Sequence, residues 1–480
     1  MVRAVNTGRA MLLRFDSLNG VRLDVLPQDG ASAGSFSVYQ PTYFPARSAF
    51  RKLQPRYSAI QMRTAFSWGF FMNRDSRPGV CIIVENQPVP FDRRVWQEAQ
   101  ALLAAGYRVS IISPKGPGCE ANTETLEGID IYRHRTWEAQ GRVGYVFEYA
   151  FALAVEFYLA WKVYARSRFR IIQGCNPPDT IFLIALAFKL LGVQFVFDHH
   201  DLSPELYEAK FGRRGLIYKM VRLAERLTFR AADLSIATNE SYRQIAIERG
   251  GMKPENVLVV QTCADLSEVS RGQPKPELKG GKRHMVLFVG VMERQDGLRL
   301  LVESIEYLVK HKRREDTRFV LIGSGTELPI LKTLATQSGV DDFVEFTGLL
   351  SHERVGPYLS TADVCVAPDP LNSLNNKSTM IKIFEYMAYS RPVVLYELEE
   401  GRRVAGDSAL YARPNDPIDF ANQIEKLLES EELRKKLGES GRKRTEEGLN
   451  WKVQSAKLVA AYAGLLAADD LAPKTSPVKM

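Results

Sequence analysis

The segment NNKSTMIKIFEYMAYSRPVV, residues 375–394, combines two lysines with one carboxylate at the start of a helical pattern. Glu385 follows Lys377 by eight positions and Lys382 by three. A site for a phosphate-bearing ligand is one explanation of this combination. An ordinary capped helix with solvated lysines is the other. For Glu385 alone, the alternative is pairing with Lys382 along their own helix, which contributes only about 0.2–0.5 kcal/mol.

The residues just before this helix favour the phosphate explanation. Ser378, Thr379 and Met380 stand where the helix is expected to begin, with Thr379 as a plausible N-cap. The first N–H groups of a helix carry about half a positive charge and bind anions. Lys382, one turn further on, adds a full charge to that end.

The chain contains no Asp-x-Asp triplet, the usual anchor for a metal-bound diphosphate. A diphosphate in this protein would therefore be neutralised by basic side chains and backbone N–H groups, without a metal ion. Each cation about 4 Å from such a group contributes about 4 kcal/mol of Coulomb energy at an effective dielectric constant near 20, before desolvation.

A second polar cluster, His199, His200 and Asp201, follows the apolar run QFVF. A polar group at the carboxyl end of a buried strand opens onto the ligand crevice of an α/β sheet. An imidazole there could hydrogen-bond a sugar or an acceptor. Two alternatives remain: the residues cap the next helix, with Asp201 or Ser203 as N-cap, or they bind a metal, for which no further ligand lies nearby in the sequence.

The loop ENQPVPFDRR, residues 85–94, precedes the first long helix and contains Asp92, Arg93 and Arg94. These side chains either bind an acceptor or cap the helix, and the sequence does not separate the two.

Short apolar runs alternate with helical patterns from residue 79 onward, which predicts parallel sheets buried on both faces. The first series of predicted strands comprises 80–85, 108–114, 129–133, 170–174, 194–201, 233–239 and 256–262. The second comprises 285–290, 318–323, 343–348, 364–369 and 392–396. A chain of 480 residues exceeds the ~250–300 residues at which a single core stops growing.

We therefore predict two doubly wound, Rossmann-like α/β domains that face a cleft. The predicted divisions are a weakly structured or accessory extension (1–75), a first α/β domain (76–270), a linker (271–284), a second α/β domain (285–449), a closing helix that packs back on the first domain (450–468) and a tail (469–480).

Composition narrows the function classes. With 45% hydrophobic and 25% charged residues, the chain is globular. Residues 1–76 hold ten Lys or Arg against four Asp, hence +6 of the net charge of +8, so the remainder is nearly neutral and an extended nucleic-acid surface is not expected. Five isolated cysteines without C-x-x-C, and no secretory signal in residues 1–30, predict a cytoplasmic protein without disulfides or zinc.

Residues 145–169 are the most apolar stretch, but Glu148, Glu156 and Lys162 interrupt it. A charge at the bilayer centre costs roughly 2.5–3.5 kcal/mol, so we expect a long helix that is buried or lies on a membrane surface. Its aromatic residues either join the core or contact lipid: Phe147, Tyr149, Phe151, Phe157, Tyr158 and Trp161.

Several segments resemble the GT-B glycosyltransferases of family 4, in the right order over residues 80–465. The second-domain segments are FVG...DG, FVLIGSGTELPILKTLA, VEFTGLLSHERVGPYLSTADVCVAPD and KSTMIKIFEYMAYSRPVV; the first-domain segments are DRRVWQEAQALLAAGYRVSIISP and FDHHDLSPELY. The resemblance implies transfer of a sugar from a nucleotide-sugar donor to a glycan or polyprenyl-linked sugar, with retention and without a metal or other cofactor. It also implies possible peripheral contact with the inner face of the cell membrane.

The resemblance also assigns roles to residues of the second domain. Glu385 would hold the donor ribose and Leu349 would lie where the base is read. Family members carry a Glu at position 377 and basic residues at positions 291 and 296, where this chain has Lys377, Val291 and Asp296. Arg294 is the only basic residue left in that loop and is the expected replacement. The remaining donor-site residues implied are Gly290, Gly323, Gly325, Lys377, Ser378, Thr379, Met380 and Lys382, and the catalytic residues are His200, Asp201, Arg294 and Lys382.

Two other functions are consistent with the same architecture. A nucleotide-sugar epimerase would need acid and base carboxylates in the cleft, and none stands out. A catalytically inert binding subunit would explain the departures at positions 291, 296 and 377. A dehydrogenase is excluded because no G-x-G-x-x-G follows a strand.

Overall fold

The computed structural model describes residues 12–15, 21–24, 77–135, 141–212, 214–269 and 272–471. For residues 12–15, 21–24, 141–149, 210, 352 and 469–471 only the backbone is described. Within the first compact unit, Met1–Val38, strands β1 (Leu12–Phe15) and β2 (Val21–Asp24) pair antiparallel. The rest of the predicted extension, up to residue 75, lies outside the described residues.

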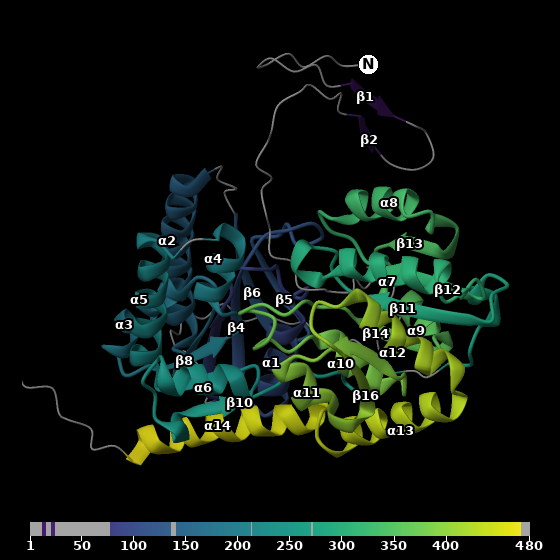
Figure 1. The fold of residues 1–480 in the computed structure, drawn as a ribbon. Helices are drawn as coiled ribbons and strands as arrows, with labels where there is room; N and C mark the ends of the chain where they lie inside the picture. Colours follow the sequence, from purple (N-terminus) through teal and green to yellow (C-terminus); the bar gives the residue numbers. More distant parts are fainter. Residues whose placement is uncertain are drawn as a thin grey trace, which may run out of the picture. The chain divides into compact units, whose positions relative to one another are not determined.

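The second unit, Tyr39–Met480, contains two α/β sheets (Figure 1). The first has eight strands in the order β10-β9-β8-β7-β3-β4-β6-β5, all parallel to their neighbours except β5. Its strands are β3 (Gly79–Ile83), β4 (Arg108–Pro114), β5 (Thr123–Leu126), β6 (Ile129–His134), β7 (Ile171–Cys175), β8 (Gln194–His199), β9 (Leu234–Ala237) and β10 (Val257–Val259). Its helices are α1 (Arg93–Ala104), α2 (Gly141–Ser167), α3 (Phe182–Lys189), α4 (Ser203–Phe211), α5 (Leu216–Ala231) and α6 (Glu240–Glu248).

The second sheet has six strands in the order β13-β12-β11-β14-β15-β16, and neighbouring strands run parallel. Its strands are β11 (His284–Val289), β12 (Thr317–Ile322), β13 (Val344–Gly348), β14 (Val364–Ala367), β15 (Val393–Tyr396) and β16 (Ala409–Ala412). Its helices are α7 (Leu298–Lys310), α8 (Leu328–Gln337), α9 (His352–Thr361), α10 (Ile381–Ala388), α11 (Glu399–Ala405), α12 (Pro417–Glu429) and α13 (Glu431–Glu447).

Both sheets are buried on both faces, as their continuous apolar runs predict. In β3, Cys81 and Ile83 belong to one core cluster, while Val80 and Ile82 belong to the cluster on the opposite face. The predicted pair of doubly wound parallel-sheet domains is confirmed. Within these two sheets, two strands were not predicted: β5 is a largely exposed edge strand, and β16 is a four-residue edge strand, ALYA, whose two central side chains are half-buried.

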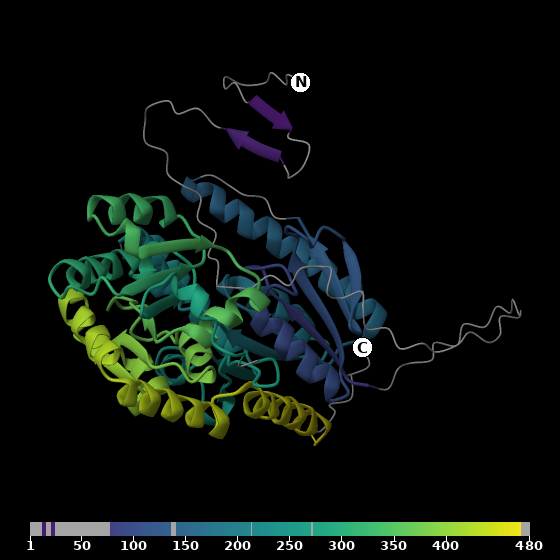
Figure 2. The same ribbon diagram turned by 90° about the vertical axis from the view of Figure 1, so that its right-hand side faces the viewer.

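The last helix, α14 (Trp451–Leu471), follows the second domain and packs against the first. Its Tyr462 ring meets Tyr107 edge-on with ring centres 6.2 Å apart, and its hydroxyl donates to Gln173 of β7. Figures 1 and 2 show this yellow helix beside the first domain.

The apolar stretch at 145–169 forms most of α2, a single helix as predicted. Glu156 lies fully buried in it, 3.5 Å from His134 Nε2. Among the residues that the structure describes, no helix combines the length and continuous apolar sequence needed to cross a bilayer.

Candidate active site

The second sheet reverses its strand order at β11, which lies between β12 and β14. The loops that leave the carboxyl ends of β11 and β14 flank this point, and open parallel sheets bind ligands where the strand order reverses. Gly297 ends the first of these loops with φ +71°. A Cβ on Gly297 would lie 2.0 Å from the carbonyl oxygen of Pro368, so the two loops pack directly against each other.

Lys382, in the first turn of α10, is held at this point by two carboxylates. Its Nζ lies 2.8 and 3.1 Å from the carboxylate oxygens of Asp369 and 3.7 Å from Oδ1 of Asp296. It also lies 5.0 Å from the centre of the Phe288 ring. The side chain is only 5% exposed, so its charge would be costly without these partners.

The charge of this group of three side chains changes near neutral pH. Burial disfavours the charged form of Lys382, but Asp369 and Asp296 outweigh it and raise the pKa of the ammonium group. Burial also raises the pKa of Asp296 to about 7, although Lys382 opposes that shift. With Lys382 charged and Asp369 ionised, the group is neutral while Asp296 is protonated and carries −1 once it ionises.

The start of α10 differs from the prediction in one respect. The N-cap is Met380, with φ −79° and ψ 112°, and no side chain caps the helix. Thr379 lies one residue too early to cap, and its hydroxyl is buried without a hydrogen-bond partner. Ser378 instead donates to the carbonyl of Leu374 at 2.9 Å. The first N–H groups of α10 therefore meet no capping side chain and can serve an anion.

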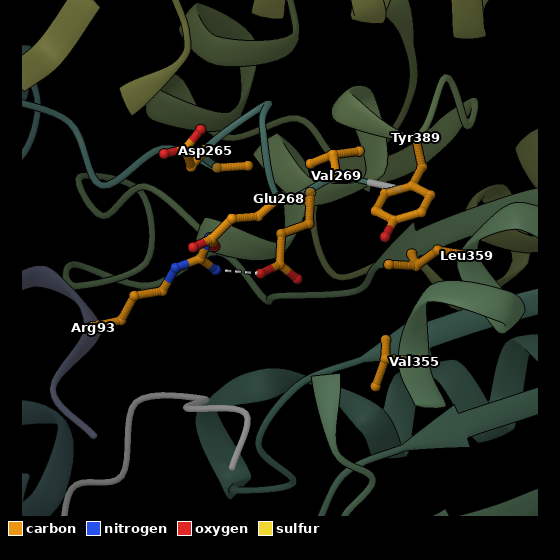
Figure 3. Close-up of a pocket in the computed structure, with 9 residues that line it drawn as sticks. Arg93, Asp265, Glu268, Val269, Val355, Leu359 and Tyr389 are labelled. Carbon is orange, nitrogen blue, oxygen red and sulfur yellow. Dashed lines mark hydrogen bonds and ion pairs between the residues drawn. The ribbon is translucent and has the colours of Figure 1, made fainter. Parts of the chain in front are cut away.

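Glu385, one turn after Lys382, forms an ion pair with the first domain rather than with its own helix. Oε1 lies 2.8 Å from Nη1 of Arg93, at the start of α1 (Figure 3). The cavity around this pair is small, about 10 Å³. It is lined by Arg93, Ala264, Asp265, Glu268, Val269, Val355, Leu359, Glu385 and Tyr389. Three of these are acidic and one is basic, so the pocket suits hydroxyl groups better than phosphate.

Further contacts join the two domains beside α10. The Asn239 amide donates to the backbone carbonyl of Lys377 at 2.8 Å, and the Tyr242 hydroxyl lies 3.1 Å from that of Ser378. The backbone N–H and hydroxyl of Ser241 both donate to Glu400 Oε1, at 3.0 and 2.6 Å. The segment that leads into α10 is therefore held by the start of α6.

The predicted glycines of this site are explained by backbone packing. A Cβ on Gly323, which has φ +143°, would lie 1.8 Å from the Gly290 carbonyl oxygen. A Cβ on Gly325 would lie 2.3 Å from the carbonyl oxygen of Met292. These glycines let the loops after β11 and β12 approach each other.

Two other predicted donor-site residues lie on the surface of these loops. Arg294 is exposed, in a short 3₁₀ turn at Arg294–Asp296. Leu349 follows β13 and is 62% exposed.

His199 and His200 have different environments at the end of β8. The ring of His199 is fully buried among Phe197, Phe229 and Tyr242, with both nitrogens lacking a hydrogen-bond partner, and burial lowers its pKa to about 3. His200 Nε2 lies 2.6 Å from Asp198 Oδ2. Burial opposes the imidazolium form of His200, but Asp198 outweighs it and raises its pKa.

Asp201 is held through its backbone by Asn176. The Asn176 side chain accepts from the Asp201 N–H at 3.2 Å and donates to its carbonyl at 2.7 Å. Burial raises the pKa of the Asp201 carboxyl to about 6. Leu202, and neither Asp201 nor Ser203, is the N-cap of α4, so the capping alternative is wrong.

Asp198 is the centre of a buried ionic network. Arg94 donates to it from Nη2 at 2.7 Å, and Gln173 donates to it at 3.1 Å and to Glu98 at 2.7 Å. Although burial favours a protonated Asp198, Arg94 and His200 dominate and lower its pKa. Burial raises the pKa of Glu98 to about 8. Of the loop residues, Asp92 caps α1 by accepting from the Val95 N–H at 3.0 Å, whereas Arg93 and Arg94 form interior contacts.

Cys175, Asp198 and His200 each place one possible ligand atom within 4.8 Å of the others. Asp198 is already neutralised by the Arg94 guanidinium and by His200, so the residues present do not favour a divalent cation there.

Sequence reasoning missed Asp369 and Asp198 as site residues; it named Arg93 as a candidate for acceptor binding or helix capping but not as the partner of Glu385. Asp369 follows β14 after one proline in the segment VCVAPD. A polar residue just past the end of a buried strand, beside the switch point, is a sequence signal that could have identified it as a site residue. The contact between Arg93 and Glu385 joins residues 292 positions apart, and no local pattern encodes it.

Taken together, two doubly wound domains with a ligand pocket between them define a GT-B fold. Solved structures agree. Sucrose-phosphate synthase from Thermosynechococcus elongatus is similar with a TM-score of 0.68 at 19% identity, covering 82% of this chain and 100% of that one. Anabaena HepE in complex with UDP and glucose has a TM-score of 0.57 at 14% identity, covering 81% and 99%.

The chain belongs to the group 1 glycosyltransferases. Residues 283–430 match the family model described as Glycosyl transferases group 1, and residues 91–263 match the Glycosyl transferase 4-like domain. Alpha-D-kanosaminyltransferase from Streptomyces kanamyceticus is 27% identical over 176 residues, which are 36% of this chain and 44% of that protein. The chain spans about half the length of the curated relatives it matches.

Proposed function

We propose that this protein transfers a sugar from a nucleotide-diphosphate donor to a glycan or polyprenyl-linked sugar, with retention and without a metal ion or other cofactor. The observation that carries the proposal is the start of α10. Uncapped N–H groups and Lys382 lie at the switch point of the second sheet, and Glu385 lines the adjacent pocket. In this proposal the start of α10, with Lys382, binds the charged phosphates of the donor, and Glu385 on the same helix binds its neutral hydroxyl groups.

The donor diphosphate would rest against the first turn of α10, with Lys382 and the exposed Arg294 as cations. Asp369 and Asp296 reduce the charge that Lys382 presents, so the backbone N–H groups and Arg294 carry a larger share of the binding. The ribose would take the hydroxyl-binding pocket beside Glu385, and its hydroxyls would replace the contact with Arg93. Arg93, on the facing domain, would then be released towards the donor.

In the proposed reaction the bond between the sugar and the diphosphate breaks, and its electron pair leaves with the diphosphate oxygen. The acceptor hydroxyl attacks on the same face, and its proton passes to the departing oxygen. Stabilisation of the negative leaving group by the α10 N–H groups, Lys382 and Arg294 is the main catalytic contribution. His200 and Asp201, at the end of β8, would orient the transferred sugar or the acceptor by hydrogen bonds.

Nucleotide-sugar stabilisation followed by transfer tests this proposal. UDP-, GDP-, ADP- and TDP-sugars are compared for their effect on the melting temperature, with UDP-sugars first because similar folds bind UDP. A donor at about 100 times its Kd should add about 2.7 kcal/mol to the free energy of unfolding. Glu385→Ala should remove this stabilisation while the melt stays cooperative, and normal turnover in that variant would refute the site.

Transfer of radiolabelled sugar to an acceptor separates this function from the alternatives. An epimerase would interconvert the donor without an acceptor, and an inert subunit would bind nucleotide without turnover. The family models favour transfer over epimerisation. We further propose a cytoplasmic location with peripheral contact at the inner face of the membrane, where a polyprenyl-linked acceptor would lie.

A further inference from the structure

The exposed apolar side chains of this protein are concentrated on three helices of the first domain. Sixteen large apolar side chains are exposed in the described part of the chain, and four of them are scattered over the second domain. The other twelve lie on α2, α3, α5 and the turn after α3: Phe151, Phe157, Tyr158, Trp161, Leu183, Leu186, Leu190, Leu191, Leu216, Ile217, Met220 and Leu223. A patch of this size on a soluble domain marks an interaction surface.

These helices are neighbours. Helix α3 contacts both α2 and α5. The ring of Phe188, on the buried side of α3, lies 5.0 Å from that of Trp161 and 6.3 Å from that of Phe157, both on α2. Figure 1 shows the three helices together at one side of the first domain. The twelve side chains therefore belong to one surface.

Helical spacing places the exposed residues on single faces. Leu183, Leu186 and Leu190 recur at intervals of three and four along and just past α3, and Leu216, Met220 and Leu223 do so on α5. Leu190 is 88% exposed and Leu216 is 75% exposed, values far above those of the core-facing residues of the same helices.

The exposed charges on the same helices have one sign. Within the described side chains of α2, α3 and α5, the exposed charged residues are Lys162, Arg166, Lys219, Arg222, Arg226 and Arg230. Among the described side chains of these helices, the acids are Glu156 and Glu225, and both are buried beside a basic partner, His134 and Arg249 respectively. The remaining lysine, Lys189, is half-buried and bonded to Asp233 at 2.6 Å.

We propose that this surface, the apolar-basic face formed by the exposed residues of α2, α3 and α5, docks on an anionic lipid bilayer. Leucine and aromatic side chains that enter the headgroup region, ringed by lysine and arginine, are what binds a bilayer surface. Tyr158 and Trp161 carry the apolar body and polar edge that suit that depth.

The positive charge of the apolar-basic face argues against a second copy of this chain or another protein as its partner. A second copy of this chain on the same face would bring six cationic side chains against six, which opposes association. A protein partner would need an acidic surface placed against these six cations, whereas an anionic bilayer supplies negative charge over its whole surface. Docking through this face does not depend on the donor chemistry proposed above, although it would bring the first domain to a lipid-linked acceptor.

Vesicle co-sedimentation of the full chain tests the proposal. The protein should sediment with vesicles of equal parts phosphatidylcholine and phosphatidylglycerol, and release as salt is raised, because screening weakens the contact. It should bind pure phosphatidylcholine vesicles much less. Each basic residue near an anionic surface contributes about fivefold, so Lys219→Glu/Arg222→Glu/Arg226→Glu should weaken binding at least about a hundredfold.

Matched controls make the result specific to this face. Lys435→Glu/Lys436→Glu/Lys443→Glu changes the same charge on exposed α13 and should leave binding unchanged. Tyr158→Ser/Leu190→Ser/Met220→Ser should reduce binding at high salt, where charge is screened, and Ile330→Ser/Ile418→Ser should not.

Equal binding by the variants of the apolar-basic face and their controls on α8, α12 and α13, or loss of vesicle binding in favour of a stable dimer, would overturn the proposal. Melting temperature and nucleotide stabilisation are measured on every variant, so a folding defect or a failure of the donor site is recognised separately from a failure of docking.

Discussion

Arg93 Nη1 lies 2.8 Å from Glu385 Oε1 and joins helix α1 of one α/β domain to helix α10 of the other. The Arg93 side chain is 25% exposed and that of Glu385 is 9% exposed, so the pair is only partly screened by solvent. In this structure Glu385, which is proposed to hold the ribose, is already paired with Arg93 of the facing domain. The proposed binding of the ribose by Glu385 would therefore compete with this contact between the domains.

A double-mutant cycle measures this contact. Arg93→Ala, Glu385→Ala and the double variant are unfolded with urea, and the free energies of unfolding are compared. We expect a coupling energy of about 1 kcal/mol, because the two groups meet in a partly buried pocket. The exposed pair Lys443–Glu447, at 3.7 Å, is the control and should couple by no more than about 0.5 kcal/mol. Strict additivity of Arg93 and Glu385 would show that the pair does not form in solution.

We expect the buried charges of Lys382 and Asp369 to depend on each other for the stability of the fold, whereas donor binding should require Lys382 itself. Lys382→Ala leaves Asp369 buried and unpaired, so we expect a loss of about 3–5 kcal/mol of stability together with loss of donor binding. Lys382→Met/Asp369→Leu removes both charges and should regain most of the stability without regaining donor-dependent stabilisation. The measurement is a urea titration with and without donor. Recovery of donor binding in the double variant would remove Lys382 from the site.

Gly323 should tolerate no side chain. Gly323→Ala forces a Cβ to 1.8 Å from the Gly290 carbonyl oxygen, so the loops after β11 and β12 must separate, and we expect a loss of at least about 2–3 kcal/mol and weaker donor binding. Gly339→Ala is the control: it also has positive φ, at +59°, but no atom lies within 4 Å of its new Cβ. That variant should lose about 1 kcal/mol and bind donor normally. Equal losses in the two variants would mean that backbone conformation alone accounts for the effect.

The sequence predicted the two sheets well because their strands are continuous apolar runs. The predicted strand 108–114 coincides with β4, and the others lie within a few residues of the observed bounds. The missed strands of these sheets, β5 and β16, both lie at a sheet edge and are not buried along their whole length: β5 has exposed side chains, and the two central side chains of β16 are half-buried. Periodicity finds strands that are buried on both faces and misses those that are not.

The site residues likewise divide into those that a local sequence pattern predicts and those that only the tertiary fold brings together. Lys382 and Glu385 lie on a short helix at a predictable sheet position, so local pattern placed them near each other. Their partners did not follow from that pattern, because Asp369 and Arg93 meet them only through the tertiary fold. Thr379 was expected to cap α10 from its residue type, but the helix begins one residue later than that assignment requires. Residue type predicts capping only when the boundary is known to a single position.

Asp296 should make donor binding depend on pH. Burial raises its pKa from 3.8 to about 7, so below pH 7 the group formed with Lys382 and Asp369 is neutral, and above pH 7 it carries −1 beside the diphosphate site. Donor affinity should therefore fall as pH rises through about 7. Asp296→Asn stays neutral, so its donor affinity should change much less over the same range. Calorimetric titration of both proteins with donor, from mildly acid to mildly alkaline buffer, measures the difference.

The same shift predicts a stability effect of definite sign. A carboxyl whose pKa is raised by folding stabilises the folded state fully below its unfolded value and loses that contribution as pH rises through its folded value. As pH rises from 3.8 to about 7, the free energy of unfolding of the wild type should therefore fall by up to about 4 kcal/mol relative to that of Asp296→Asn. The fall should be complete near pH 7. Parallel stability curves for the two proteins, with parallel donor affinities, would show that Asp296 is ionised throughout. The charge that Lys382 offers the diphosphate would then not vary with pH.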